Sequence, residues 1–373
     1  MVGEKATSKP LRLVWQGSQA RADGVQPSSR RRIALIGVGA AVSSAITQLA
    51  KLGTSHARTI AVDIDPMKLH KLEADSKIVI PKKFTKELLS GRFPPKQVAA
   101  DEALRLLEEA LTDVDIVFIV ARLDSGIAAQ ATPAIAEIAR RKGAITLSVV
   151  ARPFRPESEE NKRISRTLNE LQKKCDTVAV VDNAELTGLT HQLSLNEGEI
   201  TNQALANIVK SMVNTVSELK FTKTDFAEFR NIIEHGGLAA VGIGESSALN
   251  RAKNAVLKAF KNPMLSFDHS SATGLLAYII GDNQMTIEEA NSIEEIISGT
   301  VGNKTRVICS ASMDSELAGT IRVILVMTGI DAKNMLRGHN RIAPHLYNLE
   351  PNAKPETKLP VSLGLYQLES FES

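Results

Sequence analysis

An amphipathic helix near the middle of the chain constrains the fold more than any other stretch. Between Ala204 and Leu219, apolar residues recur every three or four positions, and this spacing places them along one side of a helix of about four turns. Strand and helix patterns precede this stretch, and a second set follows it. The sequence therefore predicts two folded halves joined by a central helix, which we place at residues 196–220.

The first half, residues 32–195, is typical of an α/β domain with a parallel, doubly wound sheet. Ile33 begins a short apolar strand, Gly37 and Gly39 follow in a turn, and a helical pattern comes next. The strand at 115–121 is almost wholly apolar, as expected when both faces of a strand are buried. A length of 373 residues leaves room for a second domain, and the pattern of the next segment predicts a smaller α+β domain at 221–332.

Both ends of the chain differ from these halves. Residues 1–31 mix Gly, Ser, Pro and Arg without periodicity, which predicts a disordered tail. Leu11–Trp15 is an exception that resembles a short strand; it either docks on the body or on a partner, or is a chance cluster. Residues 333–373 read as a polar linker that ends in an apolar tail peptide.

Charge and cysteine usage limit the class of protein. Residues 1–32 contain seven Lys or Arg and two acids, hence +5; the whole chain carries +3, so the remainder carries about −2. The body therefore offers no basic footprint for nucleic acid. Cys175 and Cys309 form neither a disulfide framework nor a zinc motif. Without a signal peptide or an apolar span, we expect a cytoplasmic protein that has no metal site of its own.

A glycine turn in the first half suggests nucleotide chemistry. The strand, turn and helix around Gly37 and Gly39 are suited to bring backbone N–H groups close to phosphate. Asp63 or Asp65, after the second strand, would suit the ribose of a dinucleotide. However, Val42 stands where that motif needs a small residue. A doubly wound fold whose turn binds nothing is the alternative.

Two acids follow the central helix. Asp225 and Glu228 are three residues apart, so on a helical turn they point to roughly the same side. They either position water for hydrolysis or simply complement the dipole at a helix N-terminus.

The order and spacing of these motifs resemble the tubulin/FtsZ family, and FtsZ more than eukaryotic tubulin. The resemblance covers most of the chain. It rests on Ile36–Gly39, Ala61–Asp65, Ala99–Glu102, Asp115–Ile119, Pro133–Ala139, Val149–Phe154, Asp225–Arg230 and Arg322–Ile330. It implies a Rossmann-like GTPase domain of the tubulin/FtsZ type, a long central helix and a smaller α+β domain at the C-terminal side. It also implies head-to-tail assembly, in which acids after the central helix enter the next subunit's nucleotide site.

The resemblance assigns roles to particular residues. The family motif NxDxxD appears here as Lys223, Asp225 and Glu228, so the last two would be catalytic in trans. The implied cofactor is GTP or GDP, with Mg²⁺ only if the nucleotide binds. The implied nucleotide-binding residues are Gly37, Gly39, Ser43, Asp65, Arg122, Ser125, Gly126, Glu157, Asn183 and Gln203.

The main phosphate loop departs from the family pattern. The family's GGGTGTG corresponds to DSGIAAQ at 124–130, within a loop that we expect at 122–130, before a helix that begins at Pro133. Asp124 places a carboxylate where a phosphate is expected. Two like charges 4 Å apart repel by about 4 kcal/mol at an effective dielectric constant near 20. Arg122 would offset this repulsion by contacting the phosphate directly.

We therefore expect a divergent FtsZ-like protein that forms or modulates head-to-tail filaments in cell division or cell shape. Its GTP binding and hydrolysis are expected to be weakened or absent. The second interpretation is an active GTPase whose phosphate site is rebuilt around Arg122, Ser43 and Ser125. The third is a Rossmann-type dinucleotide enzyme.

The expected partners follow from the same residues. One is a second copy of the chain or an FtsZ-family paralogue, held by salt-sensitive pairs of Asp225 and Glu228 with Arg122 or Arg92. Another is a membrane-tether protein that docks on the tail peptide at 359–371, unless this peptide packs back on the body.

Overall fold

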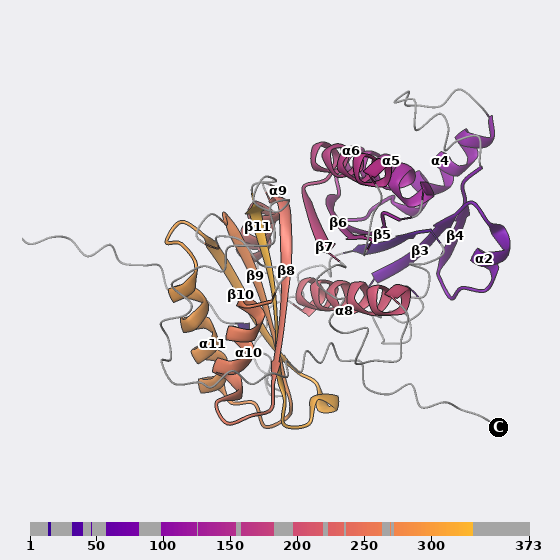
Figure 1. Ribbon diagram of the computed structural model, residues 1–373. Helices are drawn as coiled ribbons and strands as arrows, with labels where there is room; N and C mark the ends of the chain where they lie inside the picture. Colours follow the sequence, from indigo (N-terminus) through magenta and orange to yellow (C-terminus); the bar gives the residue numbers. More distant parts are fainter. Residues whose placement is uncertain are drawn as a thin grey trace, which may run out of the picture.

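The computed structural model shows two α/β halves with a long helix beside them (Figure 1). The helices and strands of each half follow one another in the sequence, as the colours of the ribbon show. The structure describes residues 14–15, 32–39, 46, 57–81, 98–124, 126–153, 158–182, 197–218, 223–234, 236–262, 269 and 272–330.

The strands form one sheet whose order is β1-β10-β9-β11-β8-β7-β6-β5-β2-β3-β4. All neighbouring strands run parallel except β11, which is antiparallel to both β8 and β9. The strands are β1 (Val14–Trp15), β2 (Ile33–Val38), β3 (Ala57–Asp63), β4 (Ser76–Val79), β5 (Ile116–Arg122), β6 (Ile145–Arg152), β7 (Thr177–Asp182), β8 (Gly237–Ser246), β9 (Gly274–Gly281), β10 (Arg306–Met313) and β11 (Ile321–Ile330).

The helices pack on both faces of this sheet. The helices are α2 (Pro66–His70), α4 (Val98–Ala110), α5 (Gly126–Arg141), α6 (Ser158–Lys174), α8 (Glu197–Glu218), α9 (Lys223–Glu234), α10 (Arg251–Phe260) and α11 (Ile287–Thr300), with a 3₁₀ turn η4 (Ser315–Leu317). One core cluster holds α4, α5 and α6 on the first half, a second holds α8 and α9, and a third holds α10 and α11. The parallel sheet is therefore covered on both faces, as such sheets require.

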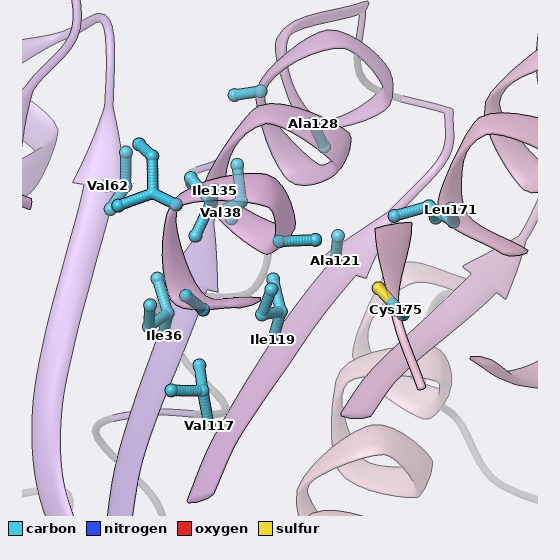
Figure 2. Close-up of a cluster of buried hydrophobic side chains, with 14 of the residues drawn as sticks. Ile36, Val38, Val62, Val117, Ile119, Ala121, Ala128, Ile135, Leu171 and Cys175 are labelled. Atoms are coloured by element: carbon cyan, nitrogen blue, oxygen red, sulfur yellow. The ribbon is translucent and has the colours of Figure 1, made fainter. Parts of the chain in front are cut away.

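The alternating side chains of β5 show how one strand supports two layers. Val117, Ile119 and Ala121 face α5, where they meet Ala128 and Ile135 (Figure 2). The residues between them join the cluster of α8. Complete burial of one large aliphatic side chain contributes roughly 1.5–3 kcal/mol, so a strand that is buried on both faces tolerates few polar residues.

The central helix α8 buries its apolar stripe as the periodicity predicts. Leu205, Ile208, Val209, Met212 and Val213 are each at most 4% exposed. They share one cluster with strands of both halves. In addition, β7 pairs with β8 from 177–180 to 237–240. The two halves are thus joined through one continuous sheet as well as through the helix.

The loop expected at 122–130 and the helix start expected at Pro133 are wrong. Helix α5 begins at Gly126 and contains Pro133 in its interior. A proline inside a helix removes the hydrogen bond to the carbonyl four residues earlier, here that of Ala129. The Thr167 hydroxyl of α6 donates to this carbonyl at 3.3 Å, and Thr132 donates to Ala128 at 2.6 Å. A contact from a neighbouring helix thus offsets the missing bond.

Two residues of the stretch Leu11–Trp15, which the sequence set apart from the tail, belong to the sheet. Val14 and Trp15 form β1, which pairs in parallel with Ser310 and Ala311 of β10. Of the readings that the sequence left open for Leu11–Trp15, the structure therefore supports docking on the body.

Candidate functional site

The carboxyl ends of β2, β3, β5 and β6 lie at one edge of the sheet, because these strands are parallel. We call this the carboxyl edge of the first half. Ligands of open α/β sheets bind at this kind of edge. Gly37 is buried within β2, and Gly39 follows the strand with φ of 87°, a conformation that favours glycine. The N–H group of Gly39 donates to Val62 at 2.8 Å, which fixes the turn.

The two acids after β3 are engaged in their own turn. Asp63 is 3% exposed and accepts from the N–H group of Asp65 at 2.9 Å. Asp65 caps α2 by accepting from the N–H group of Met67 at 3.0 Å. The predicted role of Asp65 in binding a ribose stays a prediction, whereas the structure assigns this carboxylate a capping role.

Arg122 and Asp124 form an ion pair at the end of β5. The side chains are 18% and 30% exposed, respectively, so the pair is partly shielded from water. Arg122 also reaches the carbonyl of Gly198 in the first turn of α8, at an Nη1–O distance of 3.5 Å. The sequence predicted that Arg122 contacts a phosphate; in the structure its guanidinium binds Asp124 of the same chain.

The segment that corresponds to the family's phosphate loop is mostly helical. Leu123 and Asp124 lie in a turn after β5, and Gly126–Gln130 forms the first turns of α5. A Cβ atom at Gly126 would meet nothing within 4 Å. Ala128 and Ala129 are 0% and 4% exposed, so their methyl groups belong to the core. The N-terminus of α5 favours an anion nearby, and Asp124 is a carboxylate two residues before it.

Two further basic side chains lie near this edge, and the sequence reasoning did not use them together. Arg152 ends β6 and donates to Asn161 of α6 at 3.5 Å. Arg163 of α6 pairs with Glu160 at 3.1 Å. Arg152 is the last residue of β6, and Arg122 is the last residue of β5. This shared position at a strand end was the sequence signal that could have placed both arginines at the carboxyl edge.

The remaining predicted residues are only partly described. Ser43, Ser125, Glu157 and Asn183 lie outside the described residues, and so does Arg92. Gln203 belongs to α8, while Asp225 and Glu228 belong to the first two turns of α9; the description does not extend to their side chains. The backbone of α9 keeps the spacing that places the last two residues on one side of a helix.

The described residues also bear on metal binding and on membrane insertion. They contain no group of three or more His, Cys, Asp or Glu that could hold a metal ion. None of their helices has an apolar stretch long enough to cross a bilayer.

Comparison with known proteins identifies the family. The family model described as "Tubulin/FtsZ family, GTPase domain" matches residues 32–191, and the one described as "FtsZ family, C-terminal domain" matches residues 237–331. The chain belongs to the tubulin/FtsZ family. Cell division protein FtsZ 2 of Methanocaldococcus jannaschii is 33% identical over 310 residues, which cover 82% of each chain.

Solved structures agree with this FtsZ-family assignment. A structure titled as an empty FtsZ dimer of M. jannaschii has a TM-score of 0.73 and 31% identity, and covers 82% of this chain and 90% of its own. The structure of CetZ2 from Haloferax volcanii, described as a GTPγS-bound protofilament, has a TM-score of 0.62. The match covers 82% of this chain and 97% of the CetZ2 chain. At 17% identity, the second likeness shows the fold alone. A match over both halves to FtsZ argues against the dinucleotide-enzyme interpretation.

Proposed function

We propose that this chain is an FtsZ-like cytoskeletal protein that forms or modulates head-to-tail filaments in cell division or cell shape. We further propose that its GTP binding and hydrolysis are weakened or absent. The kinship with FtsZ supports the first part, since the similar FtsZ 2 of M. jannaschii is a cell division protein and the similar FtsZ structure of that organism is a dimer. The second part rests on the carboxyl edge of the first half.

The observation that carries the proposal of weakened binding is the Arg122–Asp124 pair. A triphosphate beside the N-terminus of α5 would approach the carboxylate of Asp124, and the two negative charges would repel. The guanidinium that could compensate is already paired. GTP or GDP therefore binds weakly here, and Mg²⁺ would accompany only a bound nucleotide.

The second candidate function is an active GTPase with a rebuilt phosphate site. Two observations favour it: Gly39 keeps the left-handed backbone of a phosphate-type turn, and basic side chains end both β5 and β6. In this version Arg122 leaves Asp124 when the nucleotide arrives and binds phosphate, together with Ser43 and Ser125.

For the filament contact, we propose that Asp225 and Glu228 face the next subunit. Because the guanidinium of Arg122 is paired within its own chain, it is a poorer partner for these acids than the sequence suggested. Arg92 remains the proposed basic partner. Partly desolvated pairs of this kind contribute more than the 0–1 kcal/mol of an exposed pair.

The tail peptide at 359–371 lies outside the described residues. We propose that it binds a membrane-tether protein, because an apolar end on a polar linker orders on binding a partner. Deletion of residues 355–373 should then remove the protein from its cellular location without changing the stability of the purified body.

Sedimentation velocity at tens of micromolar protein tests the proposed function. We expect association that weakens with salt and does not require GTP. The double variant Asp225→Lys/Glu228→Lys should be monomeric. The control Glu73→Lys/Glu295→Lys makes the same charge change at two exposed positions and should still associate. A wild-type protein that stays monomeric at low salt, with and without GTP, would rule the proposal out, and assembly only with GTP would favour the active GTPase.

A further inference from the structure

The described residues of β1 cover only part of the outer edge of β10. The β10 strand pairs with β9 along all eight residues, Arg306–Met313, whereas Val14 and Trp15 pair only with Ser310 and Ala311. An edge strand presents backbone N–H and C=O groups that another strand can bind. The edge of β10 is therefore a site for strand addition, and the N-terminal arm of this chain, which carries Val14 and Trp15, supplies a strand that fits it.

The distance across the sheet makes this pairing demanding within one chain. From β1 to β2 the strand order contains eight steps, which at about 4.8 Å each amount to roughly 38 Å. Only 17 Cα–Cα steps connect Trp15 to Arg32, since 32 − 15 = 17. A free chain of that length has a root-mean-square span of roughly 23 Å. Closure within one chain is thus sterically allowed, but it requires a separation well above this root-mean-square span.

The pairing of the described residues is also short. Two residues of parallel strand form few hydrogen bonds, so the occupancy of the edge depends on the effective concentration of Val14 and Trp15 beside it. A separation above the root-mean-square span of the connection lowers that concentration. A second copy whose β10 lies closer to the root of the arm would offer the same edge at a smaller entropic cost.

We propose that the β10 edge binds the N-terminal strand of a second copy of this chain. In a pair of copies the exchange is reciprocal and can close with twofold symmetry. The β10 edge lies near the opposite end of the strand order from β3 and β4, and it includes neither the carboxyl edge of the first half nor α9. It therefore uses other elements than the head-to-tail contact proposed above.

Cysteine cross-linking can detect the exchange, because Val14 is aligned with Ser310. The hydroxyl of Ser310 is buried without a hydrogen-bond partner among the described residues, so Ser310→Cys removes no hydrogen bond there. The native Cys175 and Cys309 are buried. Burial raises the pKa of Cys175 to about 12 and also raises the pKa of Cys309. Because the thiolate is the reactive form, both native thiols should stay inert.

The experiment mixes a Val14→Cys chain with a Ser310→Cys chain that carries a tag of different mass, and oxidises them mildly. We expect several-fold more disulfide-linked heterodimer than in a control that pairs Val14→Cys with Lys142→Cys. The heterodimer should form with or without GTP, and also in the Asp225→Lys/Glu228→Lys background, so its loss is distinguishable from failure of the proposed function.

A second pair, Trp15→Cys with Ala311→Cys, repeats the test at the neighbouring aligned position in case the first geometry disfavours a disulfide. If neither mixture exceeds the control, the proposal is overturned. This holds whether the double variant Val14→Cys/Ser310→Cys closes within one chain or does not cross-link at all.

Discussion

The carboxyl ends of β8 and β9 differ sharply from those of β5 and β6. In the C-terminal half, Arg251 binds Glu289 through two nitrogens at 2.7 and 3.0 Å and binds Asp282 at 2.9 Å. Asp282 also accepts from the N–H group of Gly319. These contacts join α10, α11 and the turn before β11. At the end of β5, the charges of Arg122 and Asp124 pair across a single residue instead.

Two glycines, one from each region, also differ in how closely they are packed. A Cβ atom at Gly244 of β8 would lie 2.1 Å from the carbonyl oxygen of Ala255 in α10. A Cβ atom at Gly126 would meet nothing within 4 Å. The packing of α10 on β8 thus requires glycine at position 244, whereas the start of α5 leaves room for a side chain at position 126. The fold therefore dictates the residue at position 244, whereas a ligand or a partner can determine the residue at position 126.

The largest expected effect of a substitution is at Gly244. Replacement by Ala should destabilise the chain by roughly 3 kcal/mol or more, because the α10 backbone must move away. Gly126→Ala is the matched control and should change stability by less than about 1 kcal/mol, in the stabilising direction. Denaturant unfolding measures both. Equal losses of unfolding free energy in the two variants would contradict the proposed difference between the two glycines.

The second effect concerns the charge network. Arg251→Leu leaves Glu289 and Asp282 without their guanidinium, and we expect a loss of about 3 kcal/mol at neutral pH. The control Arg230→Leu removes a more exposed pair, in which Arg230 is 49% exposed, and should cost about 0–1 kcal/mol.

The network also predicts a pH dependence with a definite sign. The hydrogen bonds from Arg251 hold the pKa of Glu289 below its ordinary value of 4.5, against the opposing effect of burial. Its contribution to stability is therefore present above that ordinary value and is lost as the pH falls through the lowered one. In Arg251→Leu the unpaired carboxylates are least costly when protonated, so the deficit should shrink as the pH approaches 4.5. A deficit that does not depend on pH would contradict the assigned role.

The sequence predicts the elements that packing determines better than it predicts the contacts at the end of β5. The strand expected at 115–121 agrees with β5 (Ile116–Arg122) to within one residue, because burial on both faces gives it a continuous apolar sequence. The predicted start of α5 is wrong because Pro133 is typical of a helix start. The hydroxyl that compensates for this proline belongs to Thr167, 38 residues after the carbonyl of Ala129 that it contacts. The Arg122–Asp124 pair was visible as two neighbouring charges. Sequence reasoning directed both at a ligand, since nothing in the local pattern shows that the two side chains bind each other.

A smaller effect is expected for a substitution of Asp124, and it concerns the affinity for GTP rather than stability. Asp124→Asn removes the carboxylate and releases Arg122, and we expect GTP to bind about tenfold more tightly, a gain of about 1.4 kcal/mol. This is less than the full repulsion of about 4 kcal/mol, because Arg122 already cancels part of it. Asp113→Asn is the control, since Asp113 is 75% exposed and its positive φ of 63° suits Asn. Unchanged affinity in Asp124→Asn would show that the carboxylate does not limit binding.

The affinity of the full-length, unmodified chain for GTP tests the central claim most directly. Isothermal titration with GTP in the presence of Mg²⁺ measures it without any substitution. Because the Arg122–Asp124 pair places a carboxylate before the N-terminus of α5, we predict a dissociation constant weaker than about 10 μM, or a binding free energy less favourable than about −7 kcal/mol. A sub-micromolar dissociation constant would contradict the account and favour an active nucleotide site.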